Sequence, residues 1–96
     1  MQSKFSICIP RIEDNIEKYD IFHAFRKLFI GRISRIDIVK NHKSNTRRAF
    51  VHYKQLYDNE QSNNIVKHLT NGHYINVVYD FPTYWKCYKS NTYVKQ

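Results

Sequence analysis

Glycine, cysteine and long apolar runs are scarce in this 96-residue chain. Its two glycines are too few for a phosphate-cradling loop or a dinucleotide fingerprint, because each needs several. Its two cysteines, Cys8 and Cys87, are too few for a disulfide framework or a four-cysteine zinc site. No apolar run is long enough to span a membrane, and the first residues lack the apolar stretch of a secretory signal. We therefore expect an intracellular protein without membrane association.

Aromatic residues and positive charge are abundant instead. Eight Tyr, six Phe and one Trp give ample material for the core of one small domain. The formal net charge is +8, and residues 32–54 alone contribute +6 of it. β-Branched and aromatic residues are interleaved with the basic ones in this stretch, unlike in a plain solvated charge run. Such an excess favours a polyanionic partner without identifying it.

The hydrophobic pattern predicts the element order β-α-β-β-α-β. Alternating apolar and polar residues predict four strands, at residues 5–10, 32–39, 47–54 and 74–79. One helix is expected to be capped by Asp14 and ended by Gly31, and a second to be capped by Asp58 or Asn59. The expected fold is α+β and ferredoxin-like, with two helices on one face of a four-stranded antiparallel sheet. The other face is then open to solvent or ligand.

The domain is expected to cover residues 1–82, where Asp80-Phe81-Pro82 breaks the last strand. Residues 83–96 then form an aromatic and basic tail that packs on the domain at its start. Trp85 is expected to extend the small core, which leaves Lys86 exposed.

Residues 5–80 resemble an RNA-recognition motif (RRM) in element order and spacing, and Leu69-Thr70-Asn71-Gly72 resembles the family's Leu-x-Asn-Gly turn. The family's octamer motif falls on residues 46–53, where Ala49-Phe50-Val51-His52-Tyr53 matches. Thr46, Arg47 and Arg48 depart from it, and Arg48 replaces an exposed aromatic. The hexamer motif falls on residues 7–12 and places Cys8 where the family has a stacking ring. Phe50 is thus the one usual stacking position that keeps its ring.

A weaker resemblance links short strings of this chain to small stand-alone RRM-like proteins of large DNA viruses. These strings are Arg35-Ile36-Asp37-Ile38-Val39, Phe50-Val51-His52-Tyr53 and the segment from Tyr79 to Lys86. If the protein is viral, the resemblance implies a place in the host cytoplasm or the virion. It implies no particular activity.

The RRM resemblance implies binding of RNA or single-stranded DNA on the open sheet face, helped by the basic loop between the second and third strands. Bases are expected to stack on aromatic rings and on guanidinium planes. The expected nucleic-acid-binding residues are Phe50, Arg48, Arg47, His52, Lys43, Lys40, Lys86 and Tyr84.

Two features favour an alternative, in which the face binds a protein partner or a second copy of the chain. Two stacking rings are missing, and Asp37 is expected on the open face, where it could pair with Arg48 and neutralise it. No enzymatic activity, metal or cofactor is expected, because the acidic residues at the start of the first helix are explained by capping.

Overall fold

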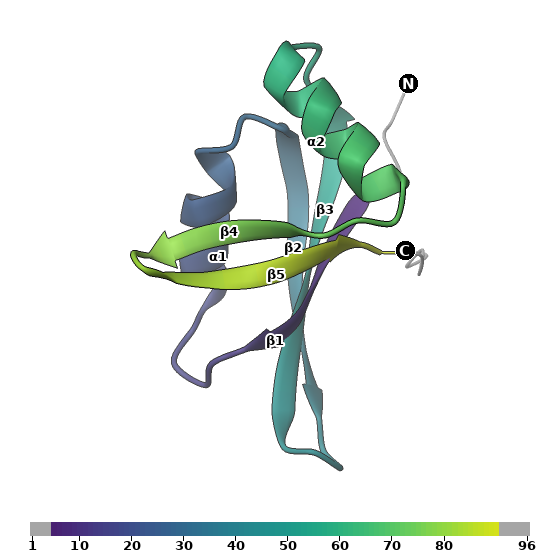
Figure 1. Cartoon of the computed structure of the whole chain (residues 1–96). Coiled ribbons are helices and arrows are strands. Elements are labelled where there is room, and N and C mark those ends of the chain that lie inside the picture. Colours follow the sequence, from purple (N-terminus) through teal and green to yellow (C-terminus); the bar gives the residue numbers. More distant parts are fainter. Residues whose placement is uncertain (1–4, 91–96) are drawn as a thin grey trace.

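The computed structural model describes residues 5–90 and contains two helices and five strands (Figure 1). The elements are β1 (Ser6–Ile12), α1 (Lys18–Arg26), β2 (Gly31–Asn41), β3 (Thr46–Leu56), α2 (Glu60–Thr70), β4 (Ile75–Asp80) and β5 (Thr83–Lys89). The strands form one antiparallel sheet in the order β2-β3-β1-β5-β4. The α+β class is therefore confirmed, with one strand more than predicted. Neither helix in this part of the chain is long and apolar enough to cross a membrane.

The added strand is β5, whose residues were expected to form a tail outside the domain. Trp85 and Cys87 are buried while Tyr84, Lys86 and Tyr88 are exposed, so the segment alternates as a half-buried strand does. β5 lies between β1 and β4 and pairs with β1 through Ile7–Lys89 and Cys8–Tyr88. The break at residues 81–82 is the turn of a β4–β5 hairpin rather than the end of the domain. Residues 91–96 of the expected tail lie outside the described residues.

The core lies between the sheet and the two helices. The inward side chains of β1 and β3 alternate as predicted, and α1 and α2 supply apolar residues against them. Fully or nearly fully buried members of this core are Ile7, Ile9, Ala49, Val51, Ile21, Phe25 and Leu69. The opposite face of the sheet carries the polar and aromatic residues of the same strands. The alternation of β3 therefore fixes Arg48, Phe50 and His52 on the open face.

The first helix differs from its prediction at both ends. Its N-cap is Glu17, which forms a capping box with Asp20, rather than Asp14. It ends at Arg26, and Phe29 rather than a glycine adopts the left-handed conformation, with φ at 52°. Gly31 begins β2 instead, where a Cβ would overlap the carbonyl oxygen of Gln55.

Of the two predicted caps of the second helix, Asp58 and Asn59, the structure confirms Asn59. The Asn59 side chain accepts a hydrogen bond of 2.7 Å from the backbone N–H of Ser62.

Candidate nucleic-acid interface

The strand register places Cys8 between two aromatic residues on the open face. Cys8 of β1 lies opposite Phe50 of β3 on one side and opposite Tyr88 of β5 on the other. Directly opposed residues of neighbouring strands point to the same face of the sheet. Phe50 is half-buried and Tyr88 is 38% exposed. The position that lacks a ring in β1 is thus flanked by rings from both neighbouring strands.

A third ring, Tyr74, continues this row. Its centroid lies 5.7 Å from that of Tyr88, and the two rings are tilted by 46°. Tyr74 joins the row only through its contact with Tyr88, and Tyr88 is not among the expected binding residues because no strand was expected at residues 83–89. The alternation of Tyr84, Lys86 and Tyr88 with buried neighbours is the signal that would have found it.

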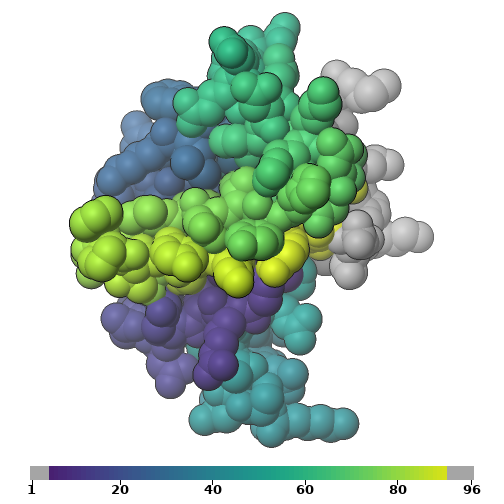
Figure 2. Space-filling model, in the orientation of Figure 1, coloured from purple at the N-terminus to yellow at the C-terminus, as the bar shows by residue number. Residues whose placement is uncertain are grey.

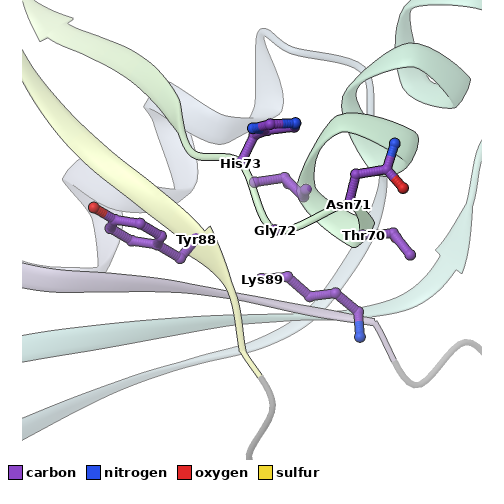
Figure 3. A pocket seen from close by; sticks show the side chains of 7 residues that line it. Thr70, Asn71, Gly72, His73, Tyr88 and Lys89 are labelled. Atoms are coloured by element: carbon purple, nitrogen blue, oxygen red, sulfur yellow. The ribbon is translucent and has the colours of Figure 1, made fainter.

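A pocket of about 470 Å³ adjoins Tyr88 where β5 approaches the C-terminal end of α2. Figure 3 shows Lys89 beside the turn of Asn71, Gly72 and His73, with Tyr88 across the pocket. No acidic residue lines this pocket. Lys89 lies opposite Ile7, which is buried against the helices, so this pocket lies on the helix side of the sheet and does not continue the aromatic row.

Two basic side chains flank the aromatic row. Arg48 precedes Phe50 by two residues on the same face and lies opposite Val39 of β2. Its guanidinium forms no ion pair within residues 5–90. Lys86 precedes Tyr88 by two residues, and its ammonium nitrogen lies 5.0 Å from the centroid of the Tyr74 ring. The face therefore carries positive charge beside its rings.

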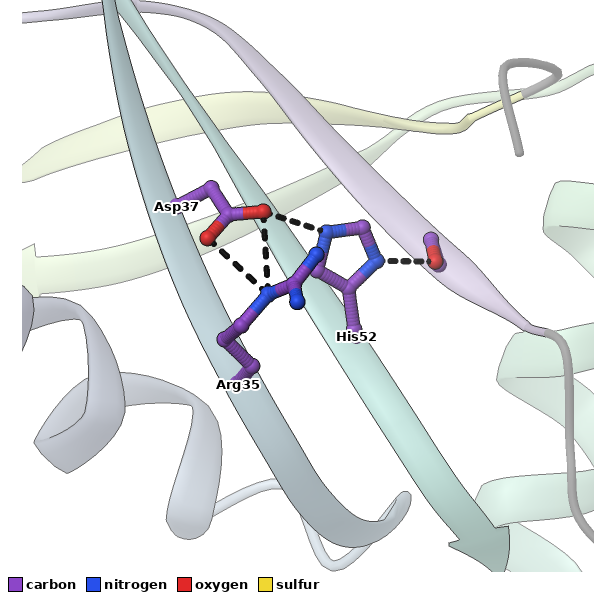
Figure 4. Close-up of polar contacts among 4 residues, drawn as sticks. Arg35, Asp37 and His52 are labelled. Carbon is purple, nitrogen blue, oxygen red and sulfur yellow. Dashed lines mark hydrogen bonds and ion pairs between the residues drawn. The ribbon is translucent and has the colours of Figure 1, made fainter. Parts of the chain in front are cut away.

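Asp37, an acidic residue of this face, contacts two other neighbours, Arg35 and His52 (Figure 4). One carboxylate oxygen lies 3.0 Å from Arg35 Nε, and the other lies 3.0 Å from His52 Nε2. The Nδ1 atom of His52 lies 2.7 Å from the Ser6 hydroxyl. The alternative that Asp37 pairs with Arg48 is therefore wrong, because Asp37 lies opposite Phe50 and turns to Arg35 and His52.

The expected ligand His52 is bound within this network. Its side chain is 14% exposed and lies between Ser6 and Asp37. Its ring also stacks near Phe50, with the centroids 6.3 Å apart. His52 therefore helps to position the Phe50 ring, and both of its ring nitrogens already have partners.

Arg47 lies on the other side of β3, toward the helices. Its guanidinium donates hydrogen bonds of 2.7 to 2.9 Å to three backbone carbonyl oxygens, those of Glu13, Asp14 and Ile16. These contacts tie the β1–α1 loop to β3. The structure therefore places this expected phosphate ligand away from the open face, in a role that fixes a loop.

Lys40 and Lys43 lie near the tip of the long β2–β3 hairpin, which projects beyond the rest of the sheet (Figure 1). Lys40 is paired with Arg47 in the ladder and so shares its side of the sheet. Lys43 is exposed in the turn, where its backbone N–H donates to Asn41 Oδ1 at 3.0 Å. The two lysines flank the face at a distance rather than lining the aromatic row.

Tyr84, the last of the expected residues, lies where β5 has diverged from β1. Figure 2 shows the β4–β5 hairpin crossing the molecule beside β1 and the loop that follows it. A cleft of about 430 Å³ separates them. Tyr84 and Lys86 line one side of it, and Arg11 and the acidic residues Glu13 and Asp14 line the other. Tyr84 is 48% exposed. Tyr84 and Lys86 thus extend the face into a cleft that carries both basic and acidic side chains.

At this cleft, Glu13 connects the loop after β1 to β4 and β5. Its carboxylate accepts hydrogen bonds from the Tyr79 hydroxyl at 2.5 Å and from Trp85 Nε1 at 3.3 Å. The rings of Tyr79 and Trp85 stack with centroids 3.9 Å apart. Burial would raise the pKa of Glu13, but these hydrogen bonds outweigh it and lower the pKa. Burial and the bond to Glu13 raise the pKa of Tyr79 to about 12.

The two thiols differ in access. Cys8 is half-buried on the open face, whereas Cys87 is fully buried in the core. Burial raises the pKa of Cys8, and the nearby charge of Arg48 opposes that shift. Burial also raises the pKa of Cys87. No group of three His, Cys, Asp or Glu side chains within the described chain could hold a metal ion.

No family model matches the sequence, and neither the curated proteins nor the solved structures contain a match.

Proposed function

We propose that this protein binds single-stranded nucleic acid, RNA in particular, on the open face of its sheet. The observation that carries the proposal is the row in which Cys8 lies between Phe50 and Tyr88. Base stacking on an aromatic ring contributes roughly 1–3 kcal/mol per base. The ring contributed by β5 therefore compensates for the missing ring of β1.

The spacing of the two rings favours a single strand over a duplex. Phe50 and Tyr88 lie on strands separated by β1, so their backbones are about 10 Å apart at the usual spacing between strands. Stacked bases in a duplex follow one another at about 3.4 Å per strand. Two bases can reach both rings only when they are unstacked and splayed apart, as they are in single strands bound by proteins.

The charges of the face are consistent with this ligand. Asp37 is compensated by Arg35 and lies against His52, so it does not cancel Arg48. Arg48 and Lys86 each lie two residues from a stacking ring, within reach of a phosphate that follows the stacked base. Phosphate contacts of this kind add affinity without reading the base sequence.

Protection of Cys8 from alkylation tests where nucleic acid binds. A brief pulse of a maleimide at about pH 8.5 should label Cys8 and spare Cys87, because Cys87 is 0% exposed. A saturating single-stranded RNA should slow the labelling of Cys8, since the bases would cover its sulfur. A Cys8→Ser variant that is not labelled serves as the control for site assignment.

Binding that leaves the labelling rate of Cys8 unchanged would contradict the proposal. It would mean that RNA is attracted to the basic surface without occupying the sheet. Comparison of single-stranded RNA, single-stranded DNA and duplex DNA in the same assay then determines the ligand class.

The exposed valines on this face favour one alternative function, association with a protein or with a second copy. Val39 and Val78 are 46% and 51% exposed, and the open face would hide both in a sheet-to-sheet contact. Light scattering distinguishes the two proposals. An oligomer that dissociates in Phe50→Ala, with nucleic-acid affinity unchanged, would support self-association instead.

A further inference from the structure

A second surface, away from the aromatic row, has the features of a peptide-binding groove. It lies between α1, the segment that connects α1 to β2, and the residue that follows β3, and it encloses about 400 Å³. Three aromatic side chains line it: Phe22, Phe29 and Tyr57 are 40%, 62% and 38% exposed. Exposed rings gathered in one groove are typical of a site that buries them against a partner.

The backbone of Phe29 is held in a conformation that disfavours its own side chain. Its φ of 52° lies in the left-handed region, which glycine adopts freely and other residues adopt at a cost. The segment is fixed by α2, because Asn59 Nδ2 donates to the Phe29 carbonyl at 3.3 Å and Gln61 Nε2 donates to the Leu28 carbonyl at 2.8 Å. The Ser62 hydroxyl donates to the next carbonyl, at 2.7 Å. A bulky exposed ring at such a fixed position is a sign of function.

The edge of the sheet runs beside this groove. β2 is the last strand in the sheet order, so one side of its backbone pairs with no strand among residues 5–90. Gly31, Arg32 and Ile33 at its start line the groove. An extended peptide that pairs with β2 would therefore place alternate side chains against the three rings.

The charge around the groove indicates which kind of partner it can bind. Arg26 and Arg32 line it, and none of its lining residues is acidic. In an antiparallel pairing of two β2 edges centred on Ile36, Arg32 of each chain would lie opposite Lys40 of the other, which disfavours that pairing between copies. An acidic segment would instead be attracted to the same basic side chains.

We propose that this groove and the adjoining edge of β2 bind an extended, acidic segment of a partner protein, which adds a strand to the sheet and inserts an apolar side chain among Phe22, Phe29 and Tyr57. The protein would then join a nucleic acid on one face to a protein on another. This surface shares no residue with the proposed nucleic-acid site.

Selection of peptides from a random nonapeptide phage library on the immobilised full chain tests the proposal. We expect enriched peptides that combine acidic residues with aromatic or aliphatic ones. Phe29→Gly should weaken their binding about tenfold or more, as is usual for a central ring of an interface. It should fold at least as well as the wild type, because glycine suits the left-handed conformation. Arg32→Glu should weaken binding similarly.

Tyr19→Ala provides the control, since Tyr19 is a ring on α1 that is 70% exposed and does not line the groove. Recovery of no peptide above background, or of peptides that bind Phe29→Gly equally well, would overturn the proposal. So would an oligomer in solution that dissociates in Phe29→Gly, which would make the occupant a second copy. A loss of RNA affinity in Phe29→Gly would assign the groove to nucleic acid.

Discussion

Truncation of Tyr88 tests the most specific consequence of the strand order, that β5 supplies a stacking ring. Tyr88→Ala removes the ring on one side of Cys8 and leaves Phe50 on the other. One lost stack of roughly 1–3 kcal/mol weakens binding by roughly 5- to 150-fold. The ring, not the hydroxyl, carries this effect, so Tyr88→Phe should bind nearly as tightly as the wild type.

The matched control is Tyr57→Ala. Tyr57 has the same exposure as Tyr88, 38%, so the two truncations remove similar buried area from the fold. Tyr57 lies in the groove beside α1 and not in the aromatic row. Tyr57→Ala should therefore destabilise the protein to a similar extent and leave its affinity for nucleic acid unchanged.

The assay is fluorescence anisotropy of a labelled single-stranded RNA of about ten nucleotides, within the range that such surfaces bind, titrated at several salt concentrations. Loss of a ring lowers the affinity at every salt concentration by the same factor, because no phosphate contact is removed. An equal loss of affinity in Tyr88→Ala and Tyr57→Ala, or none in Tyr88→Ala, would refute the placement of the site on β5.

Three further predictions concern charge and stability. Arg48→Ala should weaken binding to all single-stranded sequences and reduce the slope of log K against log salt by about 0.7. The control Arg26→Ala, on α1, should leave the sheet site unaffected. A slope in Arg48→Ala equal to that of the wild type would contradict a phosphate contact at Arg48. Arg47→Ala should lower the free energy of unfolding by about 1–3 kcal/mol in urea titrations, because three loop carbonyls lose their donor, and an unchanged midpoint would contradict that role. Because the pKa of Glu13 is lowered in the folded state, its ionised carboxylate stabilises the fold above the ordinary carboxyl pKa, and this contribution is lost as the pH falls through the lowered value. Glu13→Gln should therefore make the free energy of unfolding depend less on pH in the acid range. An unchanged dependence on pH would contradict this role of Glu13. The raised pKa of Tyr79, about 12, acts in the opposite direction, so its contribution is lost only as the pH rises toward that value.

The position of β5 in the sheet brings basic and aromatic side chains of residues 83–89 onto the same face as those of β3. Tyr88 would be remote from Phe50 on a free tail, but as part of the sheet it lies in register with Phe50 through Cys8, and Lys86 lies two residues before it on the same strand. The same strand carries Trp85 into the core, where Glu13 and Tyr79 hold its ring. One short segment therefore completes both the core and the proposed binding face.

The sequence by itself determined the features that depend on neighbouring residues. Alternation along β3 fixed Ala49 and Val51 inward and Phe50 outward, because successive side chains of a strand point to opposite faces. Asp58 and Asn59 were the two candidate caps of the second helix, because either side chain can accept from a free backbone N–H two or three residues later, and the structure selects Asn59. Burial of Trp85 followed from its size and from the need of a small domain for apolar area.

Only the tertiary structure decided the features that depend on segments far apart in the chain. The pattern of residues 83–89 is compatible with any free strand edge, and only the pairing of Tyr88 with Cys8 places it beside β1. The direction of Arg47 was readable from alternation, but its loop acceptors were not, since they lie more than 30 residues away. The alternative interpretation paired Asp37 with Arg48, but the register of β2 against β3 sets Asp37 opposite Phe50, where it contacts Arg35 and His52 and leaves Arg48 without an ion pair within the described chain. Local pattern gives each side chain its face, whereas its partner is set by which strands meet and in which register.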